Sequence, residues 1–339
     1  MTIRGLLALG ALLAALTTGA ASARAAAQEA SRTPITLAVM RSDGVMLPFA
    51  AFDGDDDWST PWPVDIVGSR GPGEVPVNLA AIPEKWWGDA VPAEWRLWPR
   101  TAKAALILKP IAPAIVLVGF ERRLGLRTDH TANFNPFVPP FELPYPKEGL
   151  AVGGSATVAP ITSVSLLAPV VPLLAEQLRE EIDKAEERTL AAVRQNTGWN
   201  HPFNREARRK IVPTIEAWYT TAVPDSTAKV SYLEIVKKYP PQPEDEGCGL
   251  ETFVTGWVHQ DAGEERPKTQ FKALATYCDR EKASYMLPFG EMHLQGRLYW
   301  IFQLSGRDHE WYAVAEIRRD RTRVVAEYYA GGVPLSLLQ

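Results

Sequence analysis

Two groups of carboxylates in the sequence have types and spacings that could do chemistry. The first is the run Asp53-Gly54-Asp55-Asp56-Asp57. Clustered carboxylate oxygens suit a hard cation such as Ca²⁺, so Asp53, Asp55 and Asp57 are candidate metal ligands. The run lacks the remaining ligands of the D-x-[DN]-x-[DN]-G calcium loop, and an acidic surface turn is the alternative. We therefore predict no cofactor, with calcium as the one ion that this run could hold.

Six of the 11 tryptophans lie close to this acidic run in the sequence. They are Trp58, Trp62, Trp86, Trp87, Trp95 and Trp98. Flat indole faces beside carboxylates suit sugar rings, which offer apolar C–H faces and hydroxyl rims, so these six residues are candidate ligand-binding residues. The alternative is that the indoles pack a loop-rich lobe that has little regular structure to supply a core.

The second group consists of glutamates within apolar, strand-like runs. They are Glu234, Glu310 and Glu316. A carboxyl group in apolar surroundings has a raised pKa and can act as a general acid, and two such groups across a cleft can hydrolyse a glycosidic bond. Alternation along a strand can equally turn each glutamate to solvent or toward an arginine, and ion pairs also perturb pKa values. These three glutamates are the candidate catalytic residues.

The two cysteines, Cys248 and Cys278, are predicted to form a disulfide. Their midpoint is Gly263, in a polar stretch between the strand-like runs 250–259 and 269–277. A hairpin that turns at Gly263 places the cysteines opposite each other at its open end. Their spacing fits neither C-x-x-C nor a four-ligand zinc pattern.

Other catalytic motifs are absent from the sequence. It contains no G-x-S-x-G, H-E-x-x-H or P-loop motif, and its five histidines include no pair at i, i+3 or i, i+4. The sequence motifs therefore indicate neither a catalytic triad nor a transition-metal site.

The elements that must position these residues are mostly strands. An Asp-Gly pair between the runs 35–40 and 45–52 predicts a hairpin. Residues 53–99 are dense in Pro, Gly and Trp, which suits ordered loops, and 133–146 should be an extended crossing segment. Further N-terminal strands are expected at 95–99, 104–108 and 114–120.

The middle of the chain is predicted to hold a strand over 156–167 and one long amphipathic helix over 172–195. Apolar residues recur at helical spacing, and charged residues, Glu186 among them, are expected on the solvated side. Gly198 is a fitting helix end. The next segment, 211–220, is read as a strand, with a helix from Asn204 onward as the alternative.

The remainder of the chain reads as successive strands with short connections. They are expected at 229–239, 250–259, 269–277, 283–289, 298–304, 310–318 and 323–329. Connections this short require antiparallel neighbours. Residues 298–304 are apolar on both faces, so this strand should be central, with the long helix as one of its covers.

These patterns predict an α+β fold that is predominantly antiparallel β-sheet. Its parts are a signal peptide (1–27), a Trp/Pro-rich, loop-heavy β lobe (28–150), a connecting strand and amphipathic helix (151–200), and a C-terminal β-meander with the disulfide (201–339). No flexible linker separates the lobes, so we expect them to dock as one body.

The first residues predict export. A basic start at Arg4 precedes an apolar run over 5–16, and A-x-A sites end at Ala23, Ala25 and Ala27. The run is too short to span a bilayer, so we expect cleavage between about 23 and 27 and a periplasmic or extracellular protein. The later apolar stretch 104–120 is broken by Lys109 and two prolines, so the mature chain should contain no membrane span.

Composition and export together narrow the function. The formal net charge is -4 and no basic face is evident, which disfavours nucleic acid as a partner. The leading hypothesis is an exported protein that binds an unknown ligand or envelope partner. The alternatives are a carboxylate-based hydrolase that acts on carbohydrate and a purely structural envelope component.

Overall fold

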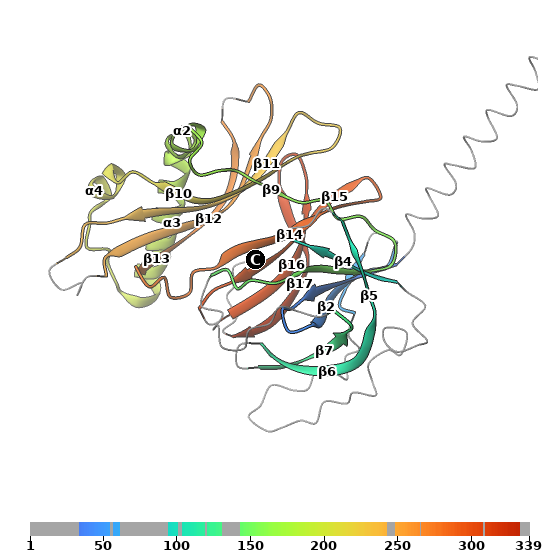
Figure 1. Cartoon of the computed structure of the whole chain (residues 1–339). Coiled ribbons are helices and arrows are strands. Elements are labelled where there is room, and N and C mark those ends of the chain that lie inside the picture. Colours follow the sequence, from blue (N-terminus) through green and yellow to red (C-terminus); the bar gives the residue numbers. More distant parts are fainter. Residues whose placement is uncertain are drawn as a thin grey trace, which may run out of the picture.

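The structure of the protein, a computed structural model, describes residues 34–54, 57–61, 94–100, 104–118, 121–130, 143–242, 248–264, 266–307 and 309–332. These residues form three antiparallel sheets and three helices (Figure 1). The predicted β-rich α+β class is therefore confirmed.

The first sheet contains eight strands in the order β5-β4-β8-β1-β2-β7-β6, with β3 paired to β2. Their bounds are β1 Ile35–Met40, β2 Val45–Phe52, β3 Trp58–Ser59, β4 Trp95–Pro99, β5 Leu106–Leu108, β6 Pro110–Val118, β7 Glu121–Thr128 and β8 Gly149–Gly153. The predicted hairpin is confirmed, because Met40 pairs with Met46 across a turn in which Gly44 has a φ of 79°. β5 and β6 are the two edge strands of this sheet, and a single residue, Lys109, separates them in the sequence. One bent segment therefore forms both edges, so the sheet curves back toward itself (Figure 1).

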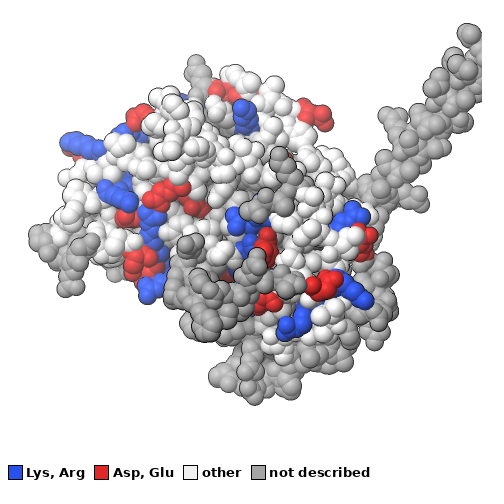
Figure 2. Space-filling view, in the orientation of Figure 1, with Lys and Arg blue, Asp and Glu red and all other residues white. Residues whose placement is uncertain are grey.

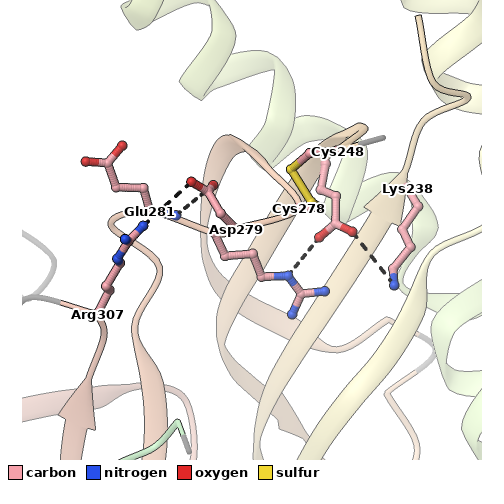
Figure 3. Close-up of a disulfide and its surroundings, with 8 residues drawn as sticks. Lys238, Cys248, Cys278, Asp279, Glu281 and Arg307 are labelled. Atoms are coloured by element: carbon pink, nitrogen blue, oxygen red, sulfur yellow. Dashed lines mark hydrogen bonds and ion pairs between the residues drawn. A yellow bond between two sulfur atoms is a disulfide. The ribbon is translucent and has the colours of Figure 1, made fainter. Parts of the chain in front are cut away.

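The second sheet has the order β13-β12-β11-β10-β9. Its strands are β9 Thr162–Ser163, β10 Thr214–Ala222, β11 Lys229–Lys238, β12 Leu250–Gln260 and β13 Lys268–Tyr277. The predicted cysteine hairpin is confirmed: Leu250 pairs with Tyr277, and the Cys248–Cys278 disulfide closes the open end (Figure 3). An ion pair of 3.9 Å between Asp279 and Arg307 lies beside it and links this end of the hairpin to a later part of the chain (Figure 3).

Two helices, α2 Val170–Gln177 and α3 Arg179–Thr197, replace the single predicted helix. A third helix, α4 Arg205–Lys210, follows them. The apolar periodicity correctly identified the buried side, since Leu174, Ile182 and Ala185 pack on the second sheet, and Leu178, where α2 and α3 meet, is fully buried. Gly198, with a φ of 75°, ends α3 as predicted. None of the helices in the described residues is both long and apolar enough to cross a bilayer.

The segments on either side of these helices differ from the prediction. The strand expected over 156–167 is reduced to β9 and an isolated bridge between Ala159 and Glu291, because this segment crosses from the first sheet to the second. The strand predicted over 211–220 begins at Thr214. Helix α4 precedes it, and the N-cap residue of this helix, Asn204, accepts a hydrogen bond from Ala207 N at 2.9 Å. The predicted strand is therefore confirmed from Thr214 onward, and the helix is limited to 205–210, before the predicted arm.

The third sheet is the predicted C-terminal meander. Its order is β14-β15-β16-β17, with bounds β14 Tyr285–Leu294, β15 Arg297–Ser305, β16 His309–Ile317 and β17 Thr322–Gly332. It is separate from the second sheet, so the strands of 201–339 do not form one meander.

The three sheets are stacked in layers, with the third in the middle. On β15, Tyr299 and Ile301 pack against the first sheet, whereas Trp300 and Phe302 face the second sheet. The expectation that β15 is covered on both faces is confirmed. The expectation that the long helix covers it is wrong, since α2 and α3 lie on the far face of the second sheet (Figure 1).

Candidate functional site

Three of the six candidate tryptophans lie in the described residues, and all three contribute to cores. Trp95 is fully buried in a cluster of first-sheet side chains. Trp58 lies with its ring centroid 5.2 Å from Phe52 and 5.4 Å from Tyr299, and Trp98 packs against the same cluster between the first and third sheets. Trp62, Trp86 and Trp87 lie outside the described residues.

The candidate calcium ligands Asp53 and Asp57 hold a turn. Asp53 Oδ1 accepts a hydrogen bond from Asp57 N at 3.2 Å, and Asp57 Oδ1 accepts one from Trp58 N at 3.0 Å. Asp55 lies outside the described residues. Within the part of the chain that the structure describes, no three His, Cys, Asp or Glu side chains are grouped as metal ligands.

Glu234 is buried between the second and third sheets. Its Oε1 accepts a hydrogen bond from Met286 N at 2.6 Å. Burial raises the pKa of Glu234 to about 8, and the Glu216 carboxylate adds to this effect, while the Met286 hydrogen bond and Arg280 oppose it. This carboxyl group therefore holds its proton at neutral pH.

Glu310 and Glu316 lie on the opposite side of the third sheet from Glu234. Glu310 accepts hydrogen bonds from Lys147 at 3.0 Å and from the Tyr312 hydroxyl. Glu316 pairs with Arg318 at 2.7 Å. The two glutamates are six residues apart on β16, which corresponds to about 20 Å. The structure therefore does not bring the three glutamates together.

A cavity that the sequence reasoning missed lies where the first sheet meets the end of β14. Its volume is about 390 Å³, which is in the range of small-molecule sites. The apolar part of its lining is Ile35, Phe52, Ala156, Ala159 and Leu294, and the polar part is Arg96, Ser155, Thr157, Glu291, His293 and Gln295.

Five separate segments position these side chains. Ile35 and Phe52 are register partners at the open end of the β1–β2 hairpin, and Arg96 comes from β4. Residues 155–159 follow β8, and the bridge between Ala159 and Glu291 fastens them to β14 through two backbone hydrogen bonds of 2.8 Å. The fifth segment is the end of β14 and its turn, where Gln295 donates a hydrogen bond to the Gly54 carbonyl.

The polar groups of the cavity include one charge of each sign. Arg96 Nε donates to Glu94 Oε1 at 2.8 Å in an exposed pair. Glu291 Oε2 accepts a hydrogen bond from Thr221 Oγ1 at 2.6 Å, which fixes the carboxylate against β10. His293 lies two residues farther along β14 and therefore on the same side of the strand. The lining can thus both donate and accept hydrogen bonds.

One sequence pattern could have pointed to this cavity. The spacing Glu291-Met292-His293 places a carboxylate and an imidazole on one face of a strand. The remaining lining residues have no common pattern because they come from distant segments. Among the described lining residues Glu291 is the single carboxylate, so the cavity supplies one of the two that a glycosidase uses.

A second polar cluster holds α3 on the second sheet. Lys237 Nζ lies 3.0 Å from Asp183 Oδ1 and 2.8 Å from Glu186 Oε2, and Tyr239 also donates to Glu186. Glu186 is 1% exposed, so its expected place on the solvated side is wrong. Burial alone would raise the pKa of Glu186, but the hydrogen bonds from Lys237 and Tyr239 hold it below its usual value. This closed network has the form of a structural ion cluster.

A third pair is formed by Ser284 and His309. Ser284 Oγ lies 2.6 Å from His309 Nε2. A serine hydrogen-bonded to a histidine is one element of a nucleophilic site. Both residues are buried, however, at the end of the third sheet where β14 and β16 begin, and neither belongs to the cavity lining.

Comparison of the chain with protein-family models, curated proteins and solved structures finds no match.

Proposed function

We propose that the protein is an exported binding protein and that its ligand is a saccharide-sized molecule held in the cavity between β4, the 155–159 segment and β14. The observation that carries this proposal is the mixed lining, in which Ala156, Ala159 and Leu294 offer partly exposed apolar surface and Arg96, Thr157 and Glu291 offer polar groups beside it. Sugar rings combine an apolar face with a rim of hydroxyls, and binding sites generally combine apolar walls with a few placed polar groups.

Export is supported by the Cys248–Cys278 disulfide, because such bridges persist in oxidising compartments. The signal-peptide pattern of the first 27 residues agrees with it. Purified mature protein with its disulfide intact is therefore the form to test.

The test is a thermal-shift screen with neutral and acidic mono- and disaccharides, followed by calorimetry. We expect at least one sugar to raise the melting temperature, because a ligand that binds only the folded state stabilises it. Trp58 offers a second readout, since its ring centroid lies 5.2 Å from that of Phe52 and its emission should change when the cavity fills.

Two arginine variants separate cavity binding from general charge effects. Arg96→Ala should weaken sugar binding by about tenfold, the value of one charge-assisted hydrogen bond, and leave the melting temperature of the ligand-free protein unchanged. Arg266→Ala is the matched control, because the Arg266 side chain is 83% exposed in the β12–β13 turn. A screen without any stabilising sugar, or equal affinities for the two variants, would reject the proposal.

A further inference from the structure

An exposed apolar patch covers the outer side of α2 and the turn before it. We call Leu166, Leu167, Val170 and Leu173 the α2 patch; their exposed fractions are 43%, 94%, 48% and 69%. Pro169 and Pro172 between them are exposed as well. Contiguous apolar surface of this kind on a folded protein usually marks an interaction site.

The patch does not serve the core. The inner side of α2, with Val171, Leu174 and Ala175, already packs on the second sheet. No Asp, Glu, Lys or Arg occurs between residues 149 and 175, so the segment has none of the charges that normally cover an outer helix face. Its outer leucines therefore require another explanation.

Basic side chains lie beside the patch. Arg179 Nη1 donates to the Arg209 carbonyl at 3.3 Å, which fixes the end of α4 next to the junction of α2 and α3. This junction is about 14 Å from the first residue of α2. In α4 the side chains of Arg205, Arg209 and Lys210 are 62%, 51% and 74% exposed.

Acidic residues pair with these cations but are shared among them. Arg205 lies 3.5 Å from Glu187 and Arg209 lies 4.0 Å from Asp183, yet Glu187 also pairs with Arg208 and Asp183 with Lys237. Glu206 forms an exposed pair with Lys210 that solvent screens. The described ion pairs of this cluster thus join five cations to four carboxylates, which are Arg205, Arg208, Arg209, Lys210 and Lys237 against Asp183, Glu186, Glu187 and Glu206. Glu176 pairs with Arg179 at the end of α2. In Figure 2 the surface over α2 is largely uncharged, and both basic and acidic side chains lie to its left, over α4.

We propose that the α2 patch docks the protein on an anionic lipid membrane. Leu167 and Leu173 enter the acyl boundary, and Arg209 and Lys210 contact the headgroup phosphates. A peripheral membrane site combines these same two parts, an apolar face and adjacent cations. The 94% exposure of Leu167 shows that the patch projects from the surface instead of lining a groove. It also holds aliphatic residues and prolines without the aromatic residues that dominate protein–protein hot spots.

The experiment is sedimentation of the full mature chain with vesicles. One set contains equimolar phosphatidylglycerol and phosphatidylcholine, and the other contains phosphatidylcholine alone. We expect binding to the anionic vesicles that falls as salt is added, and little binding to the neutral ones. Leu167→Asp/Leu173→Asp should lower the partition coefficient at least about tenfold, because two charges must then enter the membrane boundary.

Two further variants complete the design. Ile107→Asp is the matched control, because Ile107 is 75% exposed on β5 of the first sheet, and it should bind as the unmodified protein does. Arg209→Gln/Lys210→Gln tests the cationic part and should remove the preference for phosphatidylglycerol. Circular dichroism checks that every variant remains folded.

Three outcomes would overturn the proposal. The first is no sedimentation with anionic vesicles, and the second is equal binding by the Ile107 and Leu167/Leu173 variants. The third is a concentration-dependent dimer in analytical ultracentrifugation that the Leu167/Leu173 variant abolishes, because the patch would then join two copies of the chain.

Discussion

Glu234 shows how one side chain can make stability depend on pH. It is 4% exposed, it accepts one backbone hydrogen bond from Met286, and burial raises its pKa to about 8. In the unfolded chain the same carboxyl group ionises near its usual pKa of about 4.3. Between these two values the folded state binds one proton more than the unfolded state, so the contribution of Glu234 to stability is complete at low pH and is lost as pH rises toward 8.

We therefore expect Glu234→Gln to stabilise the protein more at pH 8 than at pH 5. Glutamine keeps the acceptor for Met286 N and cannot ionise, and the difference between the two pH values should be on the order of 3 kcal/mol. Urea unfolding at both pH values measures it. Glu206→Gln is the control, since the Glu206 side chain is 81% exposed. A stabilisation that is the same at pH 5 and pH 8 would show that Glu234 is ionised in the folded protein.

The sequence predicted the surroundings of single residues better than their partners. The apolar neighbours of Glu234 correctly indicated a carboxyl group in apolar surroundings, as its burial shows. Helical periodicity predicts Glu186 on the solvated side, opposite the apolar positions. Lys237, on β11, and Tyr239, just beyond it, instead bind Glu186 in the interior. Those partners are about 50 residues away in the sequence, where helical periodicity carries no information.

At the scale of elements, the contact between the 155–159 segment and β14 depends on a glycine. A Cβ atom on Gly290 would lie 2.3 Å from Val158 Cγ1 and 2.8 Å from the Ala159 carbonyl oxygen. The second atom belongs to the backbone that forms the bridge with Glu291, so it cannot move without weakening the bridge. Gly290 thus sets how closely the cavity wall approaches the third sheet.

Gly290→Ala should accordingly lower the free energy of unfolding by about 1–3 kcal/mol, the usual cost of overpacking, and speed hydrogen exchange in residues 155–159. Gly263→Ala is the matched control: Gly263 also has a positive φ, of 94°, but a Cβ there would meet nothing within 4 Å. Its cost should be limited to backbone strain, with no change in exchange near the cavity. Equal exchange in residues 155–159 for both variants would contradict the assignment.

Elements defined by local patterns were predicted well, and elements defined by distant contacts were not. The β1–β2 hairpin follows from its Asp-Gly turn, and the cysteine hairpin follows from two strands around Gly263. Residues 156–167 have strand-like composition, yet they pair only at Ala159 and in β9, because they must connect two sheets. The cavity was missed for the same reason, since its walls come from five segments.

At the scale of the whole molecule, the third sheet couples the other two. Trp300 is 0% exposed on the face toward the second sheet, where its ring centroid lies 5.1 Å from that of Trp257. Ile301, also 0% exposed, points the opposite way into the core shared with the first sheet. The two residues are neighbours on β15, so a change at either should disturb the strand that both cores share.

We expect Trp300→Ala and Ile301→Ala each to destabilise all three sheets together, by roughly 2–5 kcal/mol. Calorimetry should show one unfolding transition for each variant. Hydrogen exchange by mass spectrometry should show faster global opening in peptides from both the β1–β2 and the β12–β13 hairpins. The alternative is an N-terminal and a C-terminal unit that unfold independently. In that case Trp300→Ala would affect the β12–β13 peptides alone and Ile301→Ala the β1–β2 peptides alone. Because both faces of β15 are buried, its loss would expose two cores at once, and this shared burial is the physical reason to expect a single cooperative unit.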